Sequence, residues 1–149
     1  MKRSLTLSRY VKKRTGVPLG ASHSMRNMLS RSLGAGSFPQ FWQYWNPVWS
    51  YYLSRNVMRP LSNVLPDSIA VLFTFLVSGA LHDLAVSLVK WKAVFFFTPW
   101  FGLMGLIVIT SSKLDITYRH FARSFRAAIN LSVIAASLYL TYLMEGAFN

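Results

Sequence analysis

Three apolar stretches of membrane-spanning length constrain the fold of this 149-residue chain more than any other feature. They cover residues 68–89, 93–111 and 127–144. A helix needs about 17–25 mainly apolar residues to cross a bilayer, and a lone segment satisfies its backbone polar groups in lipid only as a helix. The sequence therefore predicts an all-α membrane protein with about three transmembrane helices, the second kinked at Pro99.

The charge distribution predicts how these helices are oriented. The chain has 16 Lys and Arg residues against 4 Asp and Glu residues, a net charge of +12. The basic residues crowd residues 1–36 and 112–126, before the first span and between the second and third. Such an excess is typical of the cytoplasmic side of membrane proteins. A nucleic-acid-binding arm is the weaker alternative, because no motif for it is present.

We therefore expect an integral membrane protein in a bacterial inner membrane or an internal membrane, with a cytoplasmic N-terminus and a C-terminus on the opposite side. Residues 1–36 would be a basic, partly helical, lipid-facing arm, and residues 37–149 the membrane domain. The polybasic face should attract anionic lipid headgroups. The absence of cysteine excludes disulfides and thiolate catalysis.

Residues 37–60 are rich in Trp and Tyr, which favour the membrane–water interface. Asn46-Pro47 is typical of a helix start, with Asn as the N-cap and Pro at the first helical position. A helix from there to Met58, ended by Arg59-Pro60, would be about 18 Å long. This is too short to span, so we expect an interfacial or re-entrant aromatic helix.

An ionisable pair, His82 and Asp83, interrupts the first apolar stretch. Such residues are costly in hydrocarbon and mark a functional site by default. Ser78 lies one helical turn before His82 and should fix its tautomer, while Gly79 leaves room for a neighbouring helix or a substrate. Asp83 points roughly 100° away from His82, so we expect it to meet a cation or polar group on another element. No metal site is expected, because the other histidines lie in the basic regions.

Each of these residues also has a purely structural interpretation. A neutral, hydrogen-bonded His82 could simply hold helices together, and this alternative is about as strong as a functional role. For Asn46, helix capping is the stronger interpretation on spacing alone. Both alternatives remain open at the level of the residues.

Two motifs in the chain resemble those of the membrane-bound O-acyltransferase family. The first is Ser37-Phe38-Pro39-Gln40-Phe41-Trp42-Gln43-Tyr44-Trp45-Asn46, and the second is Phe75-Leu76-Val77-Ser78-Gly79-Ala80-Leu81-His82. The resemblance implies acyl transfer from acyl-CoA or another acyl thioester to a hydroxyl acceptor, without a further cofactor. It implies a catalytic role for His82, as general base, and for Asn46. Supporting or substrate-binding roles fall to a larger set: Trp42, Trp45, Ser78, Gly79 and Asp83.

The chain departs from this family in two respects. Gln43 and Tyr44 stand where many members carry arginine, and members usually have many more spans arranged around a tunnel. Three spans cannot enclose an acyl chain, so we expect a second membrane chain or a homo-oligomer. The alternatives are a non-catalytic membrane subunit or partial, relic acyltransferase that binds lipid or a partner chain, and a small cationic membrane anchor.

Overall fold

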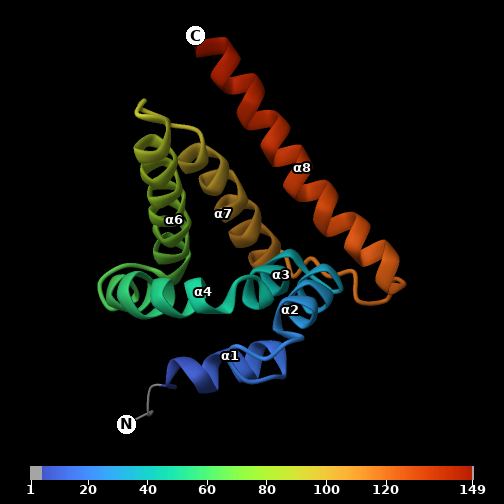
Figure 1. Cartoon of the computed structure of the whole chain (residues 1–149). Coiled ribbons are helices and arrows are strands. Elements are labelled where there is room, and N and C mark those ends of the chain that lie inside the picture. Colours follow the sequence, from blue (N-terminus) through green and yellow to red (C-terminus); the bar gives the residue numbers. More distant parts are fainter. Residues whose placement is uncertain (1–4, 149) are drawn as a thin grey trace.

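The computed structural model describes residues 5–148, and it is entirely helical over that range apart from turns and loops. Three long helices rise from a base layer of short ones (Figure 1). The base layer contains α2 (Ser24–Leu33), α3 (Phe38–Tyr44), α4 (Pro47–Leu53), the π-helix η1 (Ser54–Met58) and α5 (Arg59–Ser62). Helix α1 (Leu7–Thr15) packs beneath it.

The long helices are α6 (Asp67–Lys90), α7 (Phe97–Lys113) and α8 (Arg123–Phe148). Of the described helices, α6 and α8 are long and apolar enough to cross a membrane. Helix α7 has 17 residues, which is about 26 Å and at the lower limit for a span. It begins four residues later than the sequence indicated, because Asp83 caps the backbone at Phe96–Thr98.

Two expectations about prolines are wrong. Pro99 does not kink α7, because it lies in the first turn, where its missing N–H has no intrahelical partner in any case. Pro60 does not end the segment that starts at Pro47, which continues to Ser62. The chain accommodates Pro60 by a π-turn in which the Arg59 N–H bonds the Ser54 carbonyl, five residues back.

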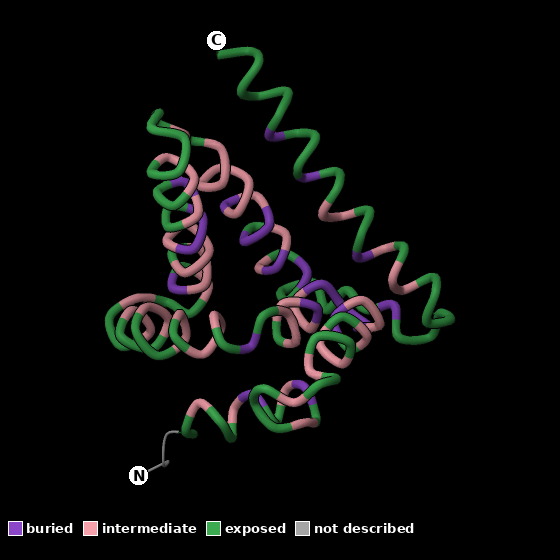
Figure 2. Tube along the Cα trace, in the orientation of Figure 1, coloured by how far each residue is buried: buried purple, intermediate pink, exposed green. Residues whose placement is uncertain are grey.

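The buried core lies where α7 meets the base layer. Its members are Ala35, Phe38, Phe41, Met104 and Val108. Helix α8 leans away from this core and is mostly exposed (Figure 2). The fully buried Asn130 ties the first turns of α8 to the base layer. Its amide NH₂ donates to the carbonyls of Leu33 and Ala35, and its amide oxygen accepts from the Tyr118 hydroxyl. Burial raises the pKa of Tyr118 to about 12.

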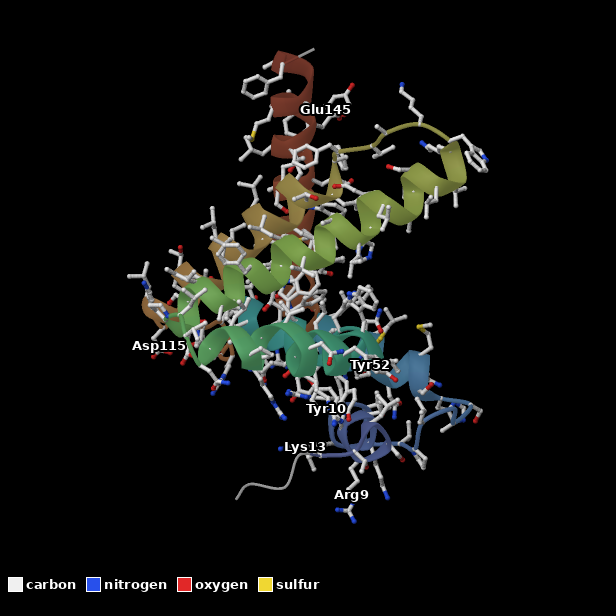
Figure 3. All side chains as sticks on the ribbon, turned by 90° about the vertical axis from the view of Figure 1, so that its left-hand side faces the viewer. Arg9, Tyr10, Lys13, Tyr52, Asp115 and Glu145 are labelled. Carbon is white, nitrogen blue, oxygen red and sulfur yellow. The ribbon has the colours of Figure 1, made fainter. Side chains whose placement is uncertain are left out.

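The described part of the basic arm packs against the base layer through one face of α1. Helix α1 packs on α4, with the Tyr10 and Tyr51 rings 5.6 Å apart, edge to face. Tyr10 thus faces the base layer, whereas Arg9 projects away from it (Figure 3). The arm therefore forms part of the folded domain over its described length; Lys2 and Arg3 lie outside the described residues.

Candidate active site

The His82 ring is held in a defined tautomer by its own helix. Its Nδ1 lies 2.6 Å from the Ser78 backbone carbonyl. A carbonyl only accepts hydrogen bonds, so Nδ1 carries a proton, and in the neutral imidazole Nε2 then keeps a free lone pair. No residue in the range 5–148 hydrogen-bonds Nε2. The half-buried ring thus presents a basic nitrogen rather than a donor to its surroundings.

Ser78 fixes this tautomer, as expected, but through its carbonyl and not its hydroxyl. The buried hydroxyl instead accepts a hydrogen bond of 3.0 Å from the indole Nε1 of Trp49. This bond joins α4 to α6 and sets the Trp49 ring edge-to-face against His82, with centroids 6.0 Å apart. Ser78 therefore orients two side chains of the site at once.

Asp83 finds its partners within the chain, at the start of α7. Its Oδ1 accepts from the N–H groups of Phe96 and Phe97 at 2.9 and 2.8 Å, and its Oδ2 accepts from the N–H and hydroxyl of Thr98 at 2.8 and 2.6 Å. The positive end of a helix is a favourable place for a carboxylate. The expected polar partner on another element is thus α7, and Asp83 gives no reason to invoke a second chain.

Gly79 allows α7 to come this close. A Cβ atom at this position would lie 2.6 Å from the Phe97 carbonyl oxygen and 2.7 Å from the Thr98 Cα. The close approach places two rings of α7 beside the imidazole. The Phe97 centroid lies 5.7 Å from that of His82, and the Phe101 centroid 4.9 Å. The pairing of α6 with α7 therefore builds one wall around His82.

Asn46 caps α4, as its place before Pro47 predicted. Its Oδ1 accepts from the Trp49 N–H at 3.3 Å, and Pro47 occupies the first turn. Its backbone adopts a left-handed conformation, with φ of 40°, which asparagine tolerates better than most residues. Because Oδ1 is the acceptor in this cap, the amide NH₂ remains available as a donor, and Asn46 is one of the residues that line the neighbouring cavity.

This cavity has a volume of about 250 Å³ and connects His82 with the basic arm. Helix α6 contributes Thr74, Ser78 and His82, and the first motif contributes Trp42, Trp45 and Asn46. The far end is lined by Tyr10 and Arg14 of α1. The Arg14 guanidinium lies 5.0 Å from the Tyr10 ring centroid and donates to the Gln43 side chain at 3.4 Å.

The two tryptophans of the first motif pack this cavity without reaching His82. The Trp42 ring meets Phe75 edge-to-face at 5.2 Å, and the Trp45 ring stacks on Phe41 at 5.6 Å. The structure thus brings the two motifs together around one cavity. Trp49, Phe101 and Arg14 also line it but were not predicted as site residues. For Trp49, the available signal was its place three residues after the capping Asn46.

Comparison with known proteins supports the resemblance of the two motifs to a known family. The model of "MBOAT, membrane-bound O-acyltransferase family" matches residues 24–144. A curated relative from Schizosaccharomyces pombe, "Probable sterol O-acyltransferase 2", is 28% identical over 122 residues, which cover 78% of this chain and 25% of that protein. The chain thus spans about a quarter of the length of this relative. No solved structure gives a significant match.

Proposed function

The chain belongs to the membrane-bound O-acyltransferase family, and we propose that it transfers an acyl group from a thioester donor to a hydroxyl acceptor, with His82 as general base. The observation that carries this proposal is the Nδ1 bond to the Ser78 carbonyl, which leaves Nε2 as a free base in a cavity. A neutral imidazole with one unprotonated nitrogen can accept a proton from a hydroxyl group.

In the proposed reaction, Nε2 removes the acceptor's hydroxyl proton while the oxygen attacks the thioester carbonyl. The tetrahedral intermediate collapses, the C–S bond breaks, and the imidazolium returns the proton to the leaving thiolate. The Asn46 amide NH₂, left free by its capping geometry, donates to the developing oxyanion. Asp83 acts as a positioning residue, because it holds the α7 wall against the imidazole.

The cavity also suggests a direction for the donor. Its α1 end carries the Arg14 guanidinium, and its His82 end is lined by aromatic rings. An anionic carrier such as that of acyl-CoA would lie at the Arg14 end, with its thioester toward His82. The name of the yeast relative makes a sterol hydroxyl the first acceptor to test.

A second candidate is a non-catalytic membrane subunit that binds lipid or another chain. It is favoured by the exposed apolar surface of α6 and α8. Leu84 and Leu88 of α6 are 54% and 63% exposed, so further helices have room to pack there. A second membrane chain, or a second copy of this chain, would cover this apolar surface.

The test is an acyl-transfer assay on the full chain in nanodiscs, with a labelled acyl thioester and a panel of sterols and other alcohols. His82→Ala and His82→Gln should lower the rate on the order of 10²–10⁴-fold. His120→Gln, in an exposed loop, is the matched control and should leave it unchanged. Full activity of His82→Gln would refute the general base. Binding of a non-reactive thioether analogue without any transfer by the wild type would favour the second candidate.

A further inference from the structure

A second concave surface lies outside the site, between the base layer and the start of α8. This groove has a volume of about 310 Å³. Its lining residues are Ser30, Arg31, Gly34, Ala35, Gln40, Tyr44, Arg123 and Arg126. Three arginines line the groove, and no carboxylate does. The whole chain has only 4 acidic residues. The groove therefore concentrates positive charge that no described acidic side chain neutralises.

Two of the three arginines are held in place by hydrogen bonds, and for Arg31 the acceptor is the Arg14 backbone carbonyl. Arg123 donates from one terminal nitrogen to the carbonyl and the hydroxyl of Ser30. Its side chain passes over Gly34, where a Cβ atom would lie 3.1 Å from the Arg123 Nε. The Nε of Arg126 is buried and has no hydrogen-bond partner among the described residues. A buried, unpaired guanidinium nitrogen is costly unless a ligand accepts from it.

We propose that this groove binds the phosphate of an anionic membrane lipid. Arginine forks match phosphate oxygens in charge and geometry. The groove adjoins the first turn of α8, whose positive end adds to the field. On the same helix as Arg123 and Arg126, the side chains of Phe125 and Leu131 are 56% and 52% exposed and offer apolar surface to lipid tails. The bound lipid would tie α8 to α2 and α3.

The test is native mass spectrometry of the purified chain with phosphatidic acid, and with phosphatidylcholine as a reference. One equivalent of phosphatidic acid should be retained by the wild type. Arg126→Gln and the pair Arg123→Gln with Arg126→Gln should lower its affinity at least tenfold. Arg9→Gln is the matched control: it removes the same charge from an exposed position that projects away from the base layer (Figure 3).

Two results would overturn the proposal. If Arg9→Gln weakened phosphatidic acid binding as much as Arg126→Gln, the attraction would belong to the whole basic face and not to this groove. If inorganic phosphate or pyrophosphate bound the groove in phosphatidylcholine nanodiscs as tightly as phosphatidic acid, the ligand would be soluble and not a lipid. Thermal unfolding of each variant, measured in parallel, separates lost binding from lost folding.

Discussion

Replacing Asp83 with Ala should destabilise the chain more than any other single loss of a carboxylate. The carboxylate accepts from three backbone N–H groups and one hydroxyl at the start of α7. Each buried donor left without a partner costs about 1–3 kcal/mol. The three backbone donors alone therefore set an expected loss of about 3 kcal/mol or more in the free energy of unfolding. Asp83→Asn keeps an acceptor for Phe96 and Phe97 and should cost about 1–2 kcal/mol.

The assay is equilibrium unfolding in mixed micelles of a mild detergent and increasing sodium dodecyl sulfate, followed by tryptophan fluorescence. Asp67→Ala is the matched control, because Asp67 is an exposed carboxylate in the first turn of the same helix. Its loss should cost only about 0.3–1 kcal/mol through the helix dipole. If Asp83→Ala lay within 1 kcal/mol of Asp67→Ala, the role given to Asp83 in holding α7 would be refuted.

Further predictions concern the contacts around this pairing and the membrane orientation. Gly79→Ala should lower both stability and any acyl transfer, because its Cβ would meet the α7 backbone at 2.6 Å. Gly146→Ala is the control: its Cβ would meet nothing within 4 Å, so it should be neutral in the same unfolding assay. Ser78→Ala should lower the free energy of unfolding by about 1 kcal/mol and shift Trp49 fluorescence, because it removes the hydrogen bond to the Trp49 indole. The His82 tautomer, which the backbone holds, should stay unchanged when measured by NMR. The wild type should lose stability between pH 10 and about 12, because the phenol of Tyr118 ionises there in the unfolded chain but not in the folded one. Tyr118→Phe should abolish this loss. A reporter fused after Asn149 should be active only on the side opposite the arm; activity on the same side would refute the predicted orientation.

The sequence predicts those parts of the fold that depend on neighbours along one helix. Apolar runs indicated the positions of the long helices, and Asn46-Pro47 indicated the start of α4 and its cap. The link between His82 and Ser78 also followed from a spacing of four residues. In each case the interacting groups lie within one turn, so helical geometry alone relates them.

The missed features depend on how separate elements meet. Asp83 binds a turn 13 to 15 residues further along the chain, and no periodicity relates these positions. The start of α7 was misplaced for the same reason, because the apolar residues from Ala93 onward look equally helical, whereas the Asp83 carboxylate binds the backbone at Phe96–Thr98. The entry of Arg14 into the cavity was missed because a run of basic residues is usually solvated, and nothing in it marks one as packed against Gln43.

The pairing of α6 and α7 links the stability of the domain to its candidate chemistry. Gly79, His82 and Asp83 occupy one turn of α6, and each acts on the same first turns of α7. A displacement of α7 that broke the Asp83 bonds would also move Phe97 and Phe101 away from the imidazole and disrupt the wall that these rings form beside it. In the proposed reaction, water admitted through a disrupted wall would compete with the acceptor hydroxyl for the base and for the thioester. Asp83 would therefore serve the proposed reaction without contacting the imidazole on its own helix, because it holds in place the aromatic wall beside the ring.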